Sequence, residues 1–412
     1  MKDKQIEKLI SLEKARQKKV INLIASENYV SNDVLKALGS ELINKYAEGY
    51  SGKRYYGGNE IIDKIENLCK DRALKLFNLN PQEWSVNVQP LSGSPANLAV
   101  YLGLLSFSNN LTPNSYNLPK IMGMSLDHGG HLTHGHKVSA TGKFWTQVSY
   151  GVDSKTEMLD YEAIKKIAVE NKPDIIVAGY TAYSRIIDFK KFREIADACP
   201  ALETGLCSIL MVDMSHFAGL VAGREYSSPF EYADVVTTTT HKTLRGPRSA
   251  MIFSKIDARE LGKKIDKAVF PGLQGGPHLN QIAAVAVALA EATKPAFKKY
   301  AKQVVKNAKV LAEELQKLGW RIVSGGTDTH LILVDTWGSA VYAGKGISGK
   351  EASDKLEKAG IIVNKNTVPN ETRSPMDPSG IRLGSSAETT RGKKEKDFKK
   401  IAQLIDKVLL EK

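Results

Sequence analysis

The chain has 412 residues, of which 42% are apolar and 25% are charged, an ordinary composition for a globular protein with about two or three domains. Its longest run of small apolar residues, 282–290, is far shorter than the roughly 20 residues that cross a bilayer. The formal net charge of +13 raises the possibility of nucleic-acid binding. However, the basic runs at 14–19 and 393–400 are interleaved with other residues, and no nucleic-acid-binding motif accompanies them.

The N-terminal segment, residues 1–19, carries charges throughout and has no apolar core, so we expect no signal peptide. Three scattered cysteines, Cys69, Cys199 and Cys207, favour a reducing compartment and argue against a disulfide framework or a zinc ribbon. We therefore expect a cytoplasmic protein.

Helical and strand patterns alternate over most of the chain, which predicts an α/β fold with a largely parallel sheet. Residues 60–77 place apolar side chains on one face of a helix. Residues 174–180, 208–213 and 235–240 are predicted to form short buried strands, and the last of these is a run of β-branched residues.

The pattern changes near residue 280, where one long helical pattern extends to about Leu318. Strands are expected after it at 321–323 and 330–335. A capping box at Ser348 and Glu351 predicts a helix that ends near Ala359. A strand at 361–363 and a final helix to Lys412 follow. The chain is thus predicted to contain an N-terminal helical arm (1–30), a large domain (31–279) and a smaller C-terminal α+β domain (280–412).

The strongest chemical signal lies at residues 235–248. Lys242 follows His241 at the end of a predicted strand, and a lysine amine becomes nucleophilic where neighbouring cations or an apolar site keep it neutral. Arg245 and Arg248 are candidate neighbouring cations. Lys242 is therefore either a Schiff-base lysine that holds pyridoxal phosphate or a surface lysine after a strand.

Two other strand ends carry groups that suit the same cofactor. Asp213 ends the strand at 208–213, and its carboxylate could pair with the pyridine nitrogen of pyridoxal phosphate or cap the next turn. Ser92, Gly93 and Ser94 precede Pro95 at a predicted helix start, where serine hydroxyls and backbone N–H groups suit a phosphate. An ordinary helix cap would have the same pattern.

A glycine-rich loop at 126–136 contains four histidines: His128, His131, His134 and His136. A metal site is possible, but the loop has neither an HExxH helix nor a cysteine pair. Stacking of an imidazole on an aromatic cofactor, or contact with substrate, is the favoured interpretation.

Three further segments offer binding groups. Residues 45–60 combine four tyrosines, Glu48 and several glycines in a surface loop, a setting that is typical of function. Residues 269–277 form a second glycine-rich loop that could approach a phosphate closely. Arg382, in a predicted short strand, is a candidate partner for a substrate carboxylate or for a structural salt bridge.

Together these segments resemble the serine hydroxymethyltransferase family of fold type I pyridoxal-phosphate enzymes. The matching segments, in the family's order, are LIASENYVS (23–31), NKYAEGYSGKRYYGG (44–58), VQPLSGSPAN (88–97), LDHGGHLTHG (126–135), VDMSHFAGLVA (212–222), VVTTTTHKTLRGPR (235–248), VFPGLQGGP (269–277), SGGTDTHL (324–331), VNKNTVPN (363–370) and SGIRLGS (379–385). Residues 108–119 and 199–207 look longer than is usual in the family.

The resemblance implies an aspartate-aminotransferase-like large domain that binds pyridoxal phosphate, in a homodimer or a dimer of dimers. It also implies reversible transfer of the hydroxymethyl carbon of L-serine to tetrahydrofolate, which gives glycine and 5,10-methylenetetrahydrofolate. Aldolase activity on other 3-hydroxy amino acids is implied as a side reaction. A threonine-type aldolase that does not use folate is the nearest alternative, and neither a metal, nor nucleic acid, nor a membrane is expected.

The resemblance also implies residue roles, with Lys242 carrying the cofactor and Asp213 holding its ring nitrogen. Other implied cofactor contacts are Tyr46, Ser92, Gly93, Ser94, His131, Thr181, His216, Thr239, Gly275 and Gly276. The implied catalytic and substrate-binding residues are Ser26, Glu48, Tyr55, Tyr56, His241 and Arg382. The implied folate contacts are Leu126, Gly130, His131, Leu132, Asn366, Ser374, Pro375 and Met376. Of these, residues 46, 48, 55, 56, 275 and 276 would act in the partner subunit's site.

Overall fold

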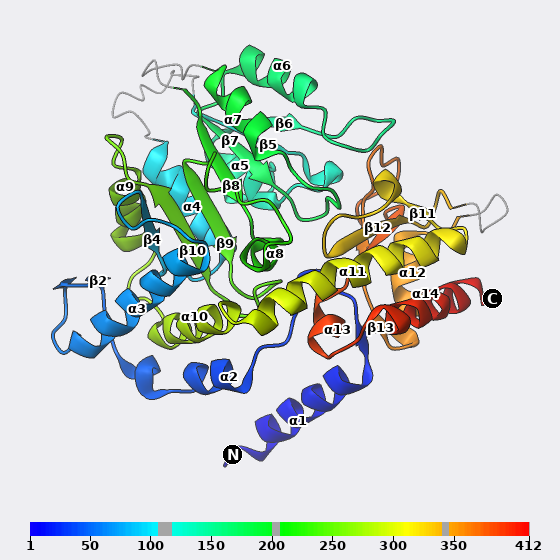
Figure 1. Ribbon diagram of the computed structural model, residues 1–412, viewed down its shortest axis with the longest axis horizontal. Helices are drawn as coiled ribbons and strands as arrows, with labels where there is room; N and C mark the ends of the chain where they lie inside the picture. Colours follow the sequence, from blue (N-terminus) through cyan, green and yellow to red (C-terminus); the bar gives the residue numbers. More distant parts are fainter. Residues whose placement is uncertain (106–117, 200–206, 340–345, 412) are drawn as a thin grey trace.

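The computed structural model describes residues 1–105, 118–199, 207–339 and 346–411, and a seven-stranded sheet lies at its centre (Figure 1). The strands of this sheet are β4 (Trp84–Asn87), β5 (Lys120–Met124), β6 (Thr146–Tyr150), β7 (Ile175–Gly179), β8 (Ile209–Asp213), β9 (Val235–Thr239) and β10 (Ala250–Lys255). Their order is β4-β10-β9-β8-β7-β5-β6. Neighbouring strands from β9 to β6 are parallel, and β10 is antiparallel to both of its neighbours.

Helices cover both faces of this sheet, so its central strands β7 to β9 are buried along nearly their whole length. On β7, Ile176 packs into one core cluster, while Ile175 and Val177 pack into another on the opposite face. The helices of this part of the chain are α2 (Asn32–Leu38), α3 (Glu60–Leu76), α4 (Gly93–Leu104), α5 (Ala140–Phe144), α6 (Tyr161–Asn171), α7 (Phe189–Asp197), α8 (Ala218–Gly223), α9 (Leu261–Lys267), η4 (Ala268–Leu273) and α10 (Leu279–Ala292). This layering brings the carboxyl ends of the parallel strands to one edge of the sheet.

The C-terminal part contains a four-stranded antiparallel sheet of order β11-β12-β15-β14. Its elements are β11 (Arg321–Ile322), η5 (Val323–Gly325), β12 (Leu331–Asp335), α12 (Gly349–Lys358), β13 (Ile361–Ile362), β14 (Asn364–Asn366), β15 (Gly380–Gly384), α13 (Ser386–Thr390) and α14 (Glu395–Leu410). The long helix α11 (Pro295–Lys317) joins the two parts, as Figure 1 shows. The apolar core changes along this helix, because Val305 packs with the large sheet and Ala308 with the C-terminal core.

The N-terminal helix α1 (Lys4–Lys19) has no buried residue and projects from the edge of the molecule in Figure 1. Strand β1 (Ile21–Asn22) follows it and pairs with β13. A short hairpin of β2 (Gly49–Tyr50) and β3 (Lys53–Arg54) follows η1 (Glu41–Asn44). No helix among the described residues is both long enough and apolar enough to span a membrane.

The structure confirms the predicted fold class and the predicted strands β7, β8 and β9. The single long helix expected from residue 280 to about Leu318 is wrong: α10 ends at Ala292 and α11 begins at Pro295. Proline has no backbone N–H and disfavours a helical residue before it, so it begins a new helix. The domain boundaries stay predictions, and most of the two long loops at 108–119 and 199–207 lies outside the described residues.

Candidate active site

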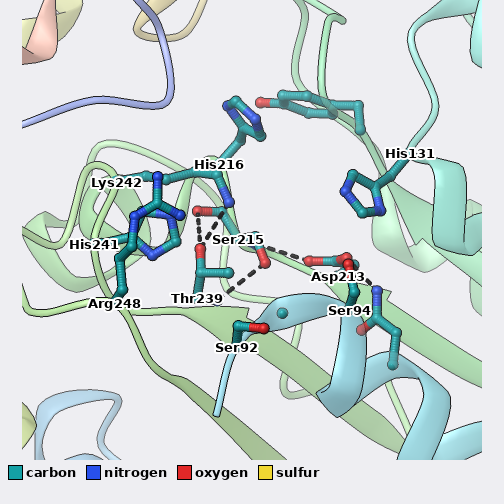
Figure 2. A pocket seen from close by; sticks show the side chains of 13 residues that line it. Ser92, Ser94, His131, Asp213, Ser215, His216, Thr239, His241, Lys242 and Arg248 are labelled. Carbon is teal, nitrogen blue, oxygen red and sulfur yellow. Dashed lines mark hydrogen bonds between the residues drawn. The ribbon is translucent and has the colours of Figure 1, made fainter. Parts of the chain in front are cut away.

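A cavity of about 200 Å³ lies at the carboxyl ends of β8 and β9 and beside the start of α4 (Figure 2). The sequence-predicted residues that line it are Ser92, Gly93, Ser94, His131, Asp213, His216, Thr239, His241, Lys242 and Arg248. Asn97, Tyr180 and Ser215 also line it, and the sequence analysis gave them no role. Five segments of the chain, at 92–97, 131, 180, 213–216 and 239–248, thus meet where the parallel strands end.

Lys242 lies in the turn after β9, and its side chain reaches into the cavity opposite His131 (Figure 2). Its Nζ donates a hydrogen bond to Thr239 Oγ1 at 2.8 Å. Burial lowers the pKa of Lys242 to about 8, and the positive charges of Arg382 and Arg248 act in the same direction. A sizeable share of neutral amine near neutral pH is what a nucleophilic lysine needs. The structure therefore does not support the surface-lysine alternative.

Asp213, the last residue of β8, is buried and carries three hydrogen bonds. Asn97 Nδ2 donates to Oδ2 at 2.8 Å, His134 Nε2 lies 3.2 Å from the same oxygen, and the Ser215 backbone N–H donates to Oδ1 at 3.0 Å. Burial alone would raise the pKa of Asp213, but the hydrogen bond from His134 and the nearby histidines hold it far below its ordinary value. The carboxylate is thus ionised and faces the cavity. Through its bond from Ser215 it also caps the turn that follows β8, as the alternative interpretation predicted, whereas helix α8 begins later with Phe217 at its N-cap.

Asn97 and His134 are the contacts that the sequence analysis missed. Asn97 lies one turn into α4, where its amide also accepts from Thr237 Oγ1 at 2.7 Å. The four-histidine pattern pointed to the right loop, but spacing alone does not show which imidazole reaches the aspartate.

Two of the four histidines of this loop contact each other: the His131 backbone N–H donates to His134 Nδ1 at 3.3 Å, and the centroids of the two rings lie 5.6 Å apart. His131 lines the cavity, and burial lowers the pKa of its imidazole to about 4, which leaves a neutral ring. His128 Nδ1 accepts from the Val152 backbone N–H, and His136 Nδ1 accepts from that of Val138. Across residues 1–105, 118–199, 207–339 and 346–411, no group of three or more histidine, cysteine or carboxylate side chains could hold a metal.

The start of α4 has the features of an anion site. Ser92 is its N-cap residue, yet its side-chain oxygen accepts no capping hydrogen bond, which leaves the first backbone N–H groups of the helix to a ligand. A Cβ added to Gly93 would lie 2.7 Å from the Thr239 side chain, which accepts the hydrogen bond from Lys242. Glycine is therefore required here, because only a residue without a side chain lets the start of α4 approach the end of β9 so closely.

Arg382, on β15, lies buried beside the cavity but does not line it. Its Nη1 donates to the Thr181 carbonyl oxygen at 2.6 Å and its Nε to Asn364 Oδ1 at 3.0 Å. Burial lowers its pKa to about 10, and among the described residues no carboxylate forms an ion pair with it. The half-buried Ser26 follows Ala25, which packs against Gly384 at the end of this strand. A buried guanidinium without a counter-ion suits an anionic substrate group.

The tyrosine loop at 44–58 does not reach this chain's cavity. Tyr46, Tyr55 and Tyr56 are 62%, 80% and 43% exposed. A Cβ added at Gly275 would lie 3.3 Å from Glu48 Oε1, and one added at Gly276 would lie 3.3 Å from the Tyr46 ring. The tyrosine loop and the second glycine-rich loop of one chain thus lie together, outside their own lysine pocket.

Apart from His131, the residues predicted to contact folate do not line the cavity either. Leu126, Gly130 and Leu132 lie in the histidine loop, where the Gly130 carbonyl accepts from Thr181 Oγ1. Asn366 ends β14, and the segment with Ser374, Pro375 and Met376 lies near it, because Lys365 Nζ donates to the Met376 carbonyl. Their role in folate binding stays a prediction.

Comparison with known proteins decides the family. The serine hydroxymethyltransferase family model matches residues 1–405. A serine hydroxymethyltransferase of Desulfotalea psychrophila is 53% identical over 407 residues, which cover 99% of this chain and 88% of that relative. The chain belongs to the serine hydroxymethyltransferase family. The resemblance given by the sequence motifs is confirmed, and the large, mostly parallel sheet is consistent with fold type I.

Enzymes of this family are pyridoxal-phosphate-dependent transferases of one-carbon metabolism. They interconvert serine and glycine with tetrahydrofolate as the cosubstrate, and they act as dimers or tetramers.

The lowered pKa of Lys242 gives a test on the cofactor-free protein. Only the neutral amine reacts with a small acylating reagent, so labelling of Lys242 should rise with pH around a midpoint of about 8. Quantitative peptide mapping of samples labelled at about pH 6 to 10 measures this midpoint. A midpoint near the ordinary lysine value of 10.5 would contradict the geometry described for this site.

Proposed function

We propose that the cavity at the ends of β8 and β9 is where this protein transfers the hydroxymethyl carbon of L-serine to tetrahydrofolate. The observation that supports it best is the position of Asp213, which ends β8, and of Lys242, which follows the end of the neighbouring strand β9; both face one cavity beside the start of α4. We also propose that the enzyme is a cytoplasmic homodimer and that it cleaves other 3-hydroxy amino acids without folate as a side activity.

The residues present fit pyridoxal phosphate. Two buried ring nitrogens, His216 Nε2 and His241 Nδ1, have no hydrogen-bond partner within the described parts of the chain, and both histidines line the cavity. Lys242 would hold the cofactor covalently, and Ser92 and Ser94 would bind its phosphate with the N-terminus of α4. The neutral ring of His131 would lie against the cofactor ring. When bound, pyridoxal phosphate supplies an electron sink for the electrons of the serine Cα–Cβ bond.

The protein's own groups then have distinct tasks. Asp213, ionised and held by three donors, would keep a proton on the ring nitrogen. Arg382 would bind the carboxylate of the amino acid, which orients its Cα–Cβ bond. Glu48 of the partner's tyrosine loop would exchange a proton with the hydroxyl group of serine. Tyr55 and Tyr56 of that loop would exclude water around it.

The role of Asp213 is tested with Asp213→Asn. An amide cannot hold the ring nitrogen protonated, so we expect the variant to bind the cofactor while its turnover with serine and tetrahydrofolate falls about a hundredfold or more. Asp33→Asn, an exposed change on α2, serves as the control and should leave the rate unchanged. Near-normal turnover of Asp213→Asn would remove the carboxylate from the mechanism.

Sharing of the site between subunits is tested by mixing two inactive variants, Lys242→Ala and Glu48→Gln. A heterodimer has one site with both lesions and one site with neither, so random exchange should restore about a quarter of the wild-type activity per chain. Mass spectrometry of the mixture confirms that subunits have exchanged. Exchange without recovery would place both residues in the same chain's site.

A further inference from the structure

Arg54, on β3, donates four hydrogen bonds, two of them inside the tyrosine loop, and its side chain is only 4% exposed. Its Nη1 donates to the carbonyl oxygens of Ala47 and Gly49, at 2.9 and 2.8 Å. These two carbonyls lie on either side of Glu48. The Tyr55 backbone N–H donates to the carbonyl of Glu48 itself at 3.0 Å. The main chain around Glu48 is therefore held at three consecutive carbonyl groups.

The other donors of Arg54 attach this segment to helix α3. Nε donates to Asp63 Oδ1 at 2.8 Å, and Nη2 donates to Glu66 Oε2 at 2.7 Å. Glu66 is buried, and α3 packs into the main core through residues such as Ile62 and Ala73. The guanidinium thus connects a short segment of irregular chain to a well-anchored helix.

Gln89 adds a connection to the proposed phosphate site. Its Nε2 donates to the Gly49 carbonyl at 3.0 Å and to Glu66 Oε2 at 3.1 Å. Gln89 follows β4 and precedes Ser92 by three residues. Its backbone carbonyl accepts a hydrogen bond from Gln274 Nε2 at 2.8 Å, so the second glycine-rich loop (269–277) is connected to the same network.

The other contacts of the hairpin lie mostly beyond Gly49: Tyr50 Oη donates to the Asp266 carbonyl at 2.6 Å, and the Gly52 backbone N–H donates to Asp63 Oδ2 at 2.8 Å. Strands β2 and β3 have two residues each, and so short a hairpin is marginal by itself. Gly49 has a φ of +91°, a left-handed conformation that favours glycine. Tyr46 and Tyr55, on either side of it, are largely exposed. Arg54 is thus the side chain that contacts the main chain on both sides of Glu48, while Gln89 shares only the Gly49 carbonyl with it.

We propose that Arg54 is a positioning residue for the reaction: it holds the backbone on both sides of Glu48 so that this carboxylate enters the partner subunit's site in one geometry. The inference rests on the proposed function, in which the tyrosine loop of one chain completes the site of the other. A buried ion pair adds little net stability over apolar residues, although removing one partner is costly, and Lys70 Nζ, 2.8 Å from Glu66 Oε1, still pairs with Glu66 when Arg54 is replaced. The two bonds to main-chain carbonyls are what tie the guanidinium to Glu48.

The test uses Arg54→Gln, Arg54→Lys and the control Lys53→Gln in the holoenzyme. Lys53 is the exposed neighbour of Arg54 on β3, so its variant removes the same charge without touching the network. We expect Arg54→Gln to lower kcat about 10- to 100-fold, since small misplacements of a catalytic group cost this much, while its cofactor absorbance stays unchanged. Arg54→Lys keeps the positive charge but loses the branched set of guanidinium donors, so its kcat should lie between those of the wild type and Arg54→Gln. Lys53→Gln should match the wild type.

Mixed dimers separate positioning from a general folding defect. Arg54→Gln mixed with Lys242→Ala should regain activity, because the heterodimer has one site with an intact lysine and an intact tyrosine loop. Arg54→Gln mixed with Glu48→Gln should regain none, because each site then receives a damaged loop.

Three outcomes would overturn the proposal. One is recovery with Glu48→Gln, which would place Arg54 in another function. Another is that Arg54→Gln regains no activity when mixed with Lys242→Ala, although Glu48→Gln does regain activity when mixed with Lys242→Ala. This result would show that Arg54→Gln damages its whole chain, and it would leave the shared site unaffected. The third is that the mixture of Lys242→Ala and Glu48→Gln itself regains no activity after subunit exchange. This result would contradict the shared site and, with it, this inference. If Arg54→Gln does not fold, the same mixtures are made with Arg54→Lys.

Discussion

The buried carboxylate of Asp213 is the constraint on which the rest of the site depends. An ionised carboxylate in a protein interior is costly unless hydrogen bonds and nearby positive charge compensate it. Asn97 from α4, His134 from the histidine loop and the backbone N–H of Ser215 provide that compensation. The requirement to satisfy one carboxylate thus brings the start of α4, the loop at 126–136 and the end of β8 together around one cavity.

The charges around this carboxylate are unbalanced. Arg382 is buried and Lys242 is half-buried, and desolvation lowers the pKa of each. One carboxylate cannot compensate these two cations, and the exposed Arg248 at the cavity wall adds a third positive charge. The surplus suits two anions, the phosphate of the cofactor and the carboxylate of an amino acid, and the family supplies both. Burial lowers the pKa values of His131 and His216, and the surplus of positive charge around them acts in the same direction, so both imidazoles are neutral.

Sequence reasoning found the residues at strand ends, because the end of a β-branched run is visible in the sequence and parallel strands end at one edge. Lys242 and Asp213 are examples, and the cavity brings them together. The same reasoning missed Asn97 and His134, which lie 116 and 79 residues from Asp213 in the chain. Neither the spacing of residues nor the hydrophobic periodicity of a sequence indicates which side chains far apart in the chain contact each other. The break before Pro295 was overlooked because the apolar period continues across it, although the proline itself was a usable signal.

The central claim is that Lys242 holds the cofactor at this cavity. The most direct measurement is borohydride reduction of the holoenzyme, followed by digestion and mass mapping of the peptide that carries the added cofactor mass. The account predicts that mass on Lys242, with the unreduced protein and the Lys242→Ala variant as negative controls. The cofactor mass on any other lysine would contradict the assignment of this cavity as the active site.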